Sequence, residues 1–330
     1  MKRRTFLKSS ATLCAAATAS ASFPTIARSA RPKLKVLITG APPDPSVHYL
    51  YYAQFNGFYE TIDVSFALFN AGTTVTRALV AGEGDVAWAP TVSTMQAIAA
   101  GARLKCIDGI TPKTDWVVIA NKQVNSLRDL EGKTFAVAAI RAPSEVGPQL
   151  LLERSKVDTK KVRWLGVGGS SARVQALLAK EVDATALTPT FAAVALRHGD
   201  FHQIGDLAKD LPRFSYCLDM ASLAAIESKS DALSAFVIGA ARGAKWALEN
   251  PKEAARASAK ILPDVSEELL LATTEAHSKS AFYNPSAIYS REDFDFMYES
   301  SLSLGMVRAG FKYEDFYYPK LALAAGAAVR

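Results

Sequence analysis

Cysteine and histidine are scarce in this sequence, and long apolar runs are missing from most of it. The 330 residues include 3 Cys and 4 His, which excludes a disulfide-rich scaffold and a cysteine-based metal cluster. After residue 30, no stretch approaches the roughly 18 uninterrupted apolar residues that a membrane-spanning helix needs. What is present, 49% hydrophobic and 21% charged residues, is the composition of an ordinary globular protein with room for about two domains.

Acidic residues are absent from residues 1–30, which contain the five bases Lys2, Arg3, Arg4, Lys8 and Arg28. The whole chain has 38 Lys and Arg and 32 Asp and Glu, which gives a net charge of +6. Without these five bases, the remaining residues have 33 bases and 32 acids and are nearly neutral. The basic character therefore belongs to the N-terminal segment. It does not indicate a nucleic-acid or membrane-surface partner.

Residues 1–30 have the pattern of an export signal: a basic start, an apolar run from Phe6 to Ile26 and Ala-x-Ala spacing at 19–21. The hexapeptide Arg3-Arg4-Thr5-Phe6-Leu7-Lys8 resembles the twin-arginine (Tat) motif, whose pathway exports folded proteins. An ordinary Sec signal with two adjacent arginines is the alternative and leads to the same compartment. We expect cleavage between residues 21 and 30, and a soluble protein in the periplasm.

Two cysteines remain after residue 30, Cys106 and Cys217. An oxidising compartment permits one bridge between them, but both lie in short apolar runs, where a buried free thiol is the commoner state. His198 and His202 have the i, i+4 spacing of a helical metal pair, but Gly199 interrupts the helix that such a pair needs. The sequence therefore predicts no metal site and no cofactor.

Short apolar runs alternate with helical patterns along the chain, which predicts an α/β fold of βαβ units with largely parallel sheets. Strands are expected at 34–39, 64–69, 85–89, 104–107, 116–120, 134–139, 162–167 and 184–187. Helices are expected at 46–59, after 70–74, and at 91–100, 148–156, 171–180 and 191–197. After an apolar run at 216–226, the rest is predicted to be mostly helical.

An internal repeat relates residues 64–101 to residues 162–199, without gaps, at an offset of 98. The order of strand, loop and helix also matches, so the polar loops 70–74 and 168–172 become equivalent. Chance similarity between two Ala-rich βαβ segments is the alternative. A true repeat predicts two α/β lobes of similar build, which bind ligands at the carboxyl ends of their strands. The identical pairs are Val64/Val162, Ala78/Ala176, Leu79/Leu177, Ala81/Ala179, Glu83/Glu181, Asp85/Asp183, Ala97/Ala195 and Gly101/Gly199.

Four motifs occur in order: Phe55-Asn56-Gly57-Phe58-Tyr59, Phe69-Asn70-Ala71-Gly72, the run from Arg77 to Ala87, and the run from Leu127 to Thr134. Over about residues 33 to 240, the chain resembles the periplasmic solute-binding proteins of ABC importers, in the group that serves taurine, alkanesulfonates, nitrate and thiamine-precursor pyrimidines. The resemblance implies a type II periplasmic binding protein: two βαβ lobes joined by two crossing strands, near 116–120 and 216–221. It implies lobe I at 31–117 and 220–330, and lobe II at 118–219.

Helix N-termini hold oxyanions through free N–H groups and a partial positive charge. Gly72-Thr73, Thr91 and Ser170 begin such helices, and their hydroxyls add donors. Arg141 follows the first strand of the second lobe, where two of its N–H groups can clamp an oxyanion. Plain helix caps and a solvated loop arginine are the alternatives. The candidate ligand-binding residues are His48, Asn70, Gly72, Thr73, Thr91, Arg141, Ser144, Ser170 and Pro189.

The sequence thus predicts a monomeric, non-enzymatic receptor that captures a small organic anion of the sulfonate, taurine or carboxylate type and delivers it to an inner-membrane ABC permease. An enzyme on the same fold is the first alternative, because relatives of the resembled group include pyrimidine synthases with a Cys-rich iron site and desulfinases with a cysteine nucleophile after the first strand. That loop reads Ala41-Pro42-Pro43-Asp44 here and has no cysteine. An extracytoplasmic sensor partner is the second alternative and shares every sequence feature.

Overall fold

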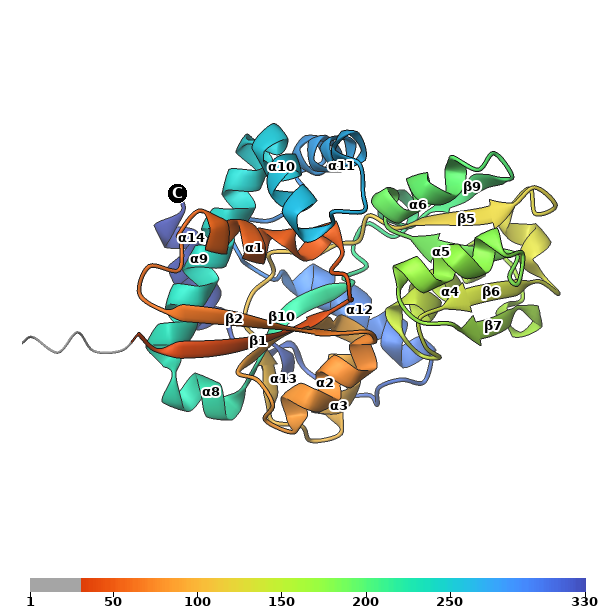
Figure 1. The fold of residues 1–330 in the computed structure, drawn as a ribbon. Helices are drawn as coiled ribbons and strands as arrows, with labels where there is room; N and C mark the ends of the chain where they lie inside the picture. Colours follow the sequence, from red (N-terminus) through yellow and green to blue (C-terminus); the bar gives the residue numbers. More distant parts are fainter. Residues whose placement is uncertain (1–30) are drawn as a thin grey trace, which may run out of the picture. The chain divides into compact units, whose positions relative to one another are not determined.

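Two five-stranded sheets organise residues 31–330, the part of the chain that the computed structural model describes (Figure 1). The predicted twin-arginine signal falls on residues 1–30 and lies outside the described residues. The fold is mixed α/β, as the alternation of apolar runs and helical patterns predicts.

The first sheet has the strand order β2-β1-β3-β10-β4. Its strands are β1 (Lys33–Thr39), β2 (Asp63–Phe69), β3 (Val86–Pro90), β4 (Leu104–Cys106) and β10 (Cys217–Ser222). β1 pairs in parallel with β2 on one side and with β3 on the other, whereas β10 runs antiparallel to both β3 and β4. The central strands are apolar because helices cover both faces of a parallel sheet.

The second sheet repeats this plan with the order β7-β6-β8-β5-β9. Its strands are β5 (Val117–Asn121), β6 (Thr134–Val137), β7 (Arg163–Gly166), β8 (Ala184–Leu187) and β9 (Phe201–Asp206). β6 is parallel to β7 and β8, and β5 is antiparallel to β8 and β9. In both sheets the first parallel strand lies between the next two along the chain, so the chain changes direction across the sheet at that strand.

The helices follow the strands in the usual alternation and then fill the C-terminal third of the chain (Figure 1). α1 packs on α9, and α9 packs on α14. Those around the first sheet are η1 (Pro45–Val47), α1 (His48–Phe55), α2 (Gly72–Val80), α3 (Thr91–Ala99), α8 (Leu223–Ser228), α9 (Ser230–Glu249), α10 (Pro251–Ile261), α11 (Glu267–Lys279), α12 (Arg291–Ser303), α13 (Tyr313–Phe316) and α14 (Pro319–Ala328). Those around the second sheet are η2 (Leu127–Leu130), α4 (Pro143–Arg154), η3 (Thr159–Lys161), α5 (Ser170–Leu178), α6 (Pro189–Leu196) and α7 (Leu207–Asp210).

The offset of 98 residues is present in the structure as well as in the sequence. α2 begins at Gly72 and α5 at Ser170, and both helices are nine residues long. β3 and β8 begin at Val86 and Ala184, again 98 residues apart. The two sheets therefore present equivalent loops after equivalent strands.

One helix begins earlier than its sequence pattern predicts. The expected helix at 148–156 is α4, which starts at Pro143 and contains Pro148. Proline fits the first turn of a helix because that turn has no partner for the missing N–H, so Pro143 starts the helix. Pro148, which the sequence predicts as the first residue of this helix, lies inside its first two turns.

The chain passes from the first sheet to the second through residues 107–116 and returns through residues 207–216. The two passages touch, because the rings of Trp116 and Tyr216 lie 4.5 Å apart between centroids. β5 and β10, the strands predicted near the crossings, begin directly after them. None of the helices within residues 31–330 is long and apolar enough to cross a membrane.

Both cysteines of the described residues are free and buried. The thiol of Cys106 donates to the carbonyl oxygen of Asp108 at 3.1 Å. Burial raises the pKa of both thiols well above its usual range. The structure thus agrees with the reading of Cys106 and Cys217 as buried thiols rather than as a bridge.

Candidate functional site

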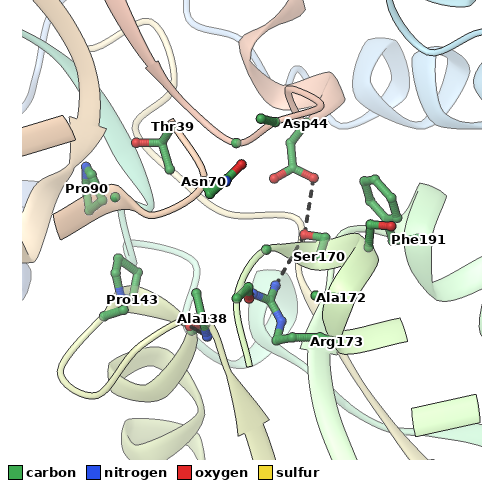
Figure 2. Close-up of a pocket in the computed structure, with 18 of the residues that line it drawn as sticks. Thr39, Asp44, Asn70, Pro90, Ala138, Pro143, Ser170, Ala172, Arg173 and Phe191 are labelled. Atoms are coloured by element: carbon green, nitrogen blue, oxygen red, sulfur yellow. Dashed lines mark hydrogen bonds between the residues drawn. The ribbon is translucent and has the colours of Figure 1, made fainter. Parts of the chain in front are cut away.

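A cavity of about 430 Å³ lies where four loops from the two sheets meet (Figure 2). The loops follow β1, β2, β6 and β7, and the walls between them include the aromatic rings of Trp116, Phe191 and Tyr216. In each sheet these loops leave the carboxyl ends of the strands at which the direction changes, which is where open α/β sheets bind ligands. The volume is that of a site for a small molecule.

Glycine shapes the first-sheet wall of the cavity at Gly72, the first residue of α2. A Cβ added there would lie 2.2 Å from Cγ of Pro90, which ends β3. Any side chain at this position would therefore push the start of α2 away from β3. Both residues line the cavity, so this close approach sets its width on that side.

Three helices begin at the cavity without a side-chain cap. These are α2 at Gly72, α4 at Pro143 and α5 at Ser170, and none of their N-cap side chains accepts a backbone N–H. The free N–H groups and the helix dipole make each N-terminus partly positive. The convergence of three such ends favours negative charge in the cavity.

Arg173 adds a full positive charge to the same wall. It lies in the first turns of α5 and is 3% exposed. Its Nη1 donates to the carbonyl oxygen of Gly168 at 3.1 Å, and its Nη2 donates to Ser170 Oγ and to the carbonyl oxygen of Ala186, each at 3.2 Å. Its Nε has no partner within residues 31–330. Burial lowers the pKa of the guanidinium, and the Asp44 carboxylate partly opposes that shift.

Asp44 is the acidic group of the cavity and comes from the loop after β1 (Figure 2). Its Oδ1 accepts hydrogen bonds from Thr188 Oγ1 at 3.3 Å and from Ser170 Oγ at 3.5 Å. Both donors belong to the second-sheet half of the chain, so Asp44 ties the two halves together. Burial raises the pKa of Asp44 to about 6, although Arg173 pulls it down.

Four of the nine residues predicted from the sequence line this cavity: Asn70, Gly72, Ser144 and Ser170. Asn70 and Gly169 face one another across it, since a Cβ on Gly169 would lie 3.8 Å from the carbonyl oxygen of Asn70. The hydroxyl of Ser144 accepts the backbone N–H of Ala138 at 2.8 Å and so holds the loop after β6 in place.

The structure does not bring His48 to the cavity lining. The imidazole is fully buried, with Nδ1 2.8 Å from Ser258 Oγ and Nε2 3.3 Å from the carbonyl oxygen of Pro43. Because a carbonyl only accepts, Nε2 carries the proton and Nδ1 accepts from Ser258. Burial lowers the pKa of His48 to about 3, so it is a neutral support for the loop after β1.

Thr73, Thr91, Arg141 and Pro189 also lie off the cavity lining. Thr91 starts α3 and is fully buried. Arg141 is exposed, and its Nη2 donates to the carbonyl oxygen of Gly305 at 3.2 Å, a residue just past α12. Its guanidinium therefore contacts the first-sheet half of the chain at the surface and does not line the cavity.

Sequence reasoning missed Asp44 and Arg173, the two charged residues of the cavity. Arg173 carried a signal, because it lies three and four residues before Ala176 and Leu177 on the apolar face of its helix, where a charge has no reason to be buried unless it is used. Asp44 stands in the Pro-rich loop after the first strand, and no motif in the sequence marks its carboxylate as a ligand-binding group. Among residues 31–330, no group of three or more His, Cys, Asp or Glu is placed to hold a metal ion.

Residues 44–254 match the profile of the family described as NMT1/THI5 like. The chain belongs to this family. The match spans more than half of the chain and includes both charged residues of the cavity. It confirms the resemblance that the four sequence motifs carry. No curated protein matches the chain significantly in sequence.

Solved structures similar to this NMT1/THI5-like chain include proteins that bind sulfonates or nitrate. The alkanesulfonate-binding protein SsuA from Xanthomonas axonopodis pv. citri, bound to MOPS, has a TM-score of 0.70 at 17% identity, over 90% of this chain and 98% of its own. The nitrate-binding protein NrtA from Synechocystis PCC 6803 has a TM-score of 0.76 at 12% identity, over 91% and 89%. The aliphatic sulphonate-binding SsuA from Escherichia coli has a TM-score of 0.68 at 15% identity, over 89% and 99%. At these identities the likeness establishes the fold, which is that of periplasmic binding proteins, as predicted.

Proposed function

We propose that this chain is a solute-binding receptor that captures a small organic anion, of the sulfonate, taurine or carboxylate type, in the cavity between its two sheets. The observation that carries the proposal is the convergence of three uncapped helix N-termini and the buried guanidinium of Arg173 on one cavity. Arg173 keeps one N–H free of protein partners, and buried donors without partners are costly. Arg173 belongs to the cavity lining, so an oxyanion bound there would lie beside its charge.

The rest of the lining suits an organic body attached to that anion. Trp116, Phe191 and Tyr216 supply aromatic surface, and Pro42 and Pro143 supply aliphatic surface. Inorganic ions would leave this surface in contact with water, whereas a carbon skeleton would cover it.

We propose binding without catalysis. The cavity lining within residues 31–330 contains no cysteine and no histidine, and the thiols nearest in the sequence to its loops are buried with raised pKa values. The loop that holds the nucleophile in the desulfinase-like alternative presents Asp44 instead. The desulfinase-type and pyrimidine-synthase-type alternatives would need a cysteine or a histidine that touches the ligand, and the described lining offers neither.

The passages at 107–116 and 207–216 are the natural hinge for such a receptor. We propose two lobes close to the bounds that the resemblance implies: residues 31–116 with 217–330, which hold the first sheet, form lobe I, and residues 117–216, which hold the second, form lobe II. Ligand closes the two by hinge motion. A monomer in the periplasm, exported by the twin-arginine signal, would then present its closed form to an inner-membrane ABC permease.

A ligand screen tests this proposal. We expect at least one sulfonate or carboxylate, in a panel that also contains nitrate and pyrimidine derivatives, to raise the melting temperature, since ligand at 100 times Kd adds about 2.7 kcal/mol of stability. Calorimetry should then show that Arg173→Gln loses about 2–5 kcal/mol of binding free energy, because the bound anion keeps no charged partner. Arg242→Gln, an exposed position on α9, is the matched control and should bind like the parent protein.

Two results would count against the proposal. One is that no anion of any class raises the melting temperature. The other is an Arg173→Gln variant that melts like the parent protein without ligand and still binds the ligand with unchanged Kd.

A further inference from the structure

The carboxylate of Asp44 has one oxygen committed to the protein and one that is not. Oδ1 accepts from Thr188 and Ser170. Oδ2 accepts no hydrogen bond from the described part of the chain, and Figure 2 shows it directed toward Asn70 and the cavity. Asp44 as a whole is only 4% exposed. This oxygen therefore faces the cavity without a hydrogen-bond donor from the described part of the chain.

Arg173 does not neutralise this carboxylate by direct contact. The guanidinium and the carboxylate are connected through Ser170 Oγ, 3.2 Å from Arg173 Nη2 and 3.5 Å from Asp44 Oδ1. Two opposite charges thus face the same cavity from different halves of the chain, one after β1 and the other in α5. Such a cavity is dipolar rather than purely positive.

We infer that the ligand carries a protonated amine or a comparable N–H-bearing cationic group that binds Asp44 Oδ2, in addition to the acidic group that binds at Arg173 and the start of α5. This inference rests on the proposed function and narrows its ligand class to amino-substituted acids. An ammonium group donates hydrogen bonds and supplies the positive charge that a buried carboxylate needs.

The neighbourhood of Asp44 Oδ2 suits a nitrogen group. Asn70 lines the same wall, and its side chain has no hydrogen-bond partner within residues 31–330, so its amide oxygen is free to accept a second N–H (Figure 2). Thr39, also on this wall, already donates its hydroxyl to the carbonyl oxygen of Trp88 at 3.1 Å. Asp44 Oδ2 and the amide oxygen of Asn70 both belong to the cavity lining, and each can accept an N–H from an ammonium group bound there.

The same carboxylate selects against simple anions. A plain alkanesulfonate, a fatty carboxylate or nitrate would place its charge or its apolar end near a buried negative group without compensating it. Repulsion of this kind is how a site rejects a ligand that otherwise fits. Burial already raises the pKa of Asp44 to about 6 although Arg173 pulls it down, so the carboxylate is only partly compensated by the charge already present.

Isosteric ligand pairs test the inference on the unmodified protein. The pairs are 2-aminoethanesulfonate with propane-1-sulfonate, 3-aminopropanoate with butanoate, and 4-(aminomethyl)benzoate with 4-ethylbenzoate. In each pair a methyl group replaces the ammonium group at the same chain length. We expect the amine member of at least one pair to bind at least tenfold more tightly by calorimetry at pH 7.5. The three lengths allow for the unknown span between the two charges.

Asp44→Asn then assigns that preference to one residue. The amide keeps an oxygen for Thr188 and Ser170 but loses the charge, so the preference should fall below twofold. Asp264→Asn, at an exposed turn between α10 and α11, should retain the full preference. Melting temperatures without ligand establish that both variants are folded, and the comparison within a pair needs no variant at all.

The outcomes separate the inference from the proposed function. Methyl members that bind as well as amine members would overturn the inference and leave the anion receptor standing. A tenfold preference that persists in Asp44→Asn would also overturn it. If no member of any pair binds but another anion of the screen does, the inference is overturned and the anion receptor stands. If no anion binds at all, both fail.

Discussion

At the scale of single residues, the most unusual feature of the core is a pair of buried carboxyl groups, Asp108 and Asp219. Both are within 1% of full burial. Tyr49 donates its hydroxyl to Asp219 Oδ2 at 2.6 Å, and the N–H of Ile110 donates to Asp108 Oδ1 at 3.2 Å. The other oxygens, Asp108 Oδ2 and Asp219 Oδ1, have no partner among residues 31–330. Burial raises the pKa of Asp219 to about 7 and that of Asp108 well above its usual range.

These raised pKa values predict a pH-dependent stability. The folded state binds a proton that the unfolded chain, with Asp near 3.8, releases, so the pair contributes stability that is complete below about pH 4 and is lost as pH rises through about 7. We expect the two carboxyl groups to hold this proton between them, and Asp108→Asn supplies a permanent N–H in its place. We expect the free energy of unfolding, measured with urea, to fall less between pH 4.5 and pH 8 in this variant than in the parent protein.

Asp264→Asn is the control for that measurement, since its exposed carboxylate should leave the pH profile of the parent unchanged. Other buried groups titrate in both proteins, so the informative quantity is the difference between the two profiles. Parallel profiles for Asp108→Asn and the parent would show that the two carboxyl groups do not share a proton.

At the scale of elements, the start of α2 against the end of β3 limits what the cavity can tolerate. A Cβ on Gly72 would lie 2.2 Å from Pro90 Cγ and 2.9 Å from Pro90 Cδ. Gly72→Ala should therefore destabilise the protein by about 1–3 kcal/mol through overpacking. It should also weaken ligand binding, because both residues line the cavity. Chemical denaturation and calorimetry measure the two effects.

Gly166→Ala is the matched control, since the nearest atom to an added Cβ in this exposed part of β7 is 3.7 Å away. Its stability should stay within about 0.5 kcal/mol of the parent. A Gly72→Ala protein as stable as Gly166→Ala would mean that α2 and β3 separate at little cost.

At the scale of the whole molecule, the two halves touch at the cavity through Asp44 and at the surface through Arg141. Arg141 donates to the carbonyl oxygen of Gly305 across the halves, but it is exposed, and exposed polar contacts contribute little. We expect Arg141→Ala to change ligand Kd by less than about twofold and stability by less than about 0.5 kcal/mol. Calorimetry measures the ligand Kd of the parent and of the variant. A tenfold loss of affinity would show that Arg141 takes part in ligand binding.

The strand and helix order was readable from the sequence because it depends on local patterns. The apolar runs at 34–39 and 64–69 match β1 and β2 within one residue, and the helix at 171–180 matches α5 within two. The offset of 98 residues predicted that the loops at the starts of α2 and α5 are equivalent. The predicted start of α4 at Pro148 is wrong, and the helix begins at Pro143. Both prolines suit a first turn, and only packing decides between them.

The members of the cavity were only partly readable. Asn70, Gly72, Ser144 and Ser170 followed from one local rule, that helix starts after strands face the ligand edge of a sheet. The sequence by itself thus determined the α/β order, the internal duplication and the likeness to solute-binding proteins. The tertiary structure decided that His48 supports a loop, that Arg141 faces Gly305, and that Asp44 and Arg173 share one buried space. The partners of Asp44, which are Ser170 and Thr188, lie 126 and 144 positions away along the chain, and no local pattern encodes that distance.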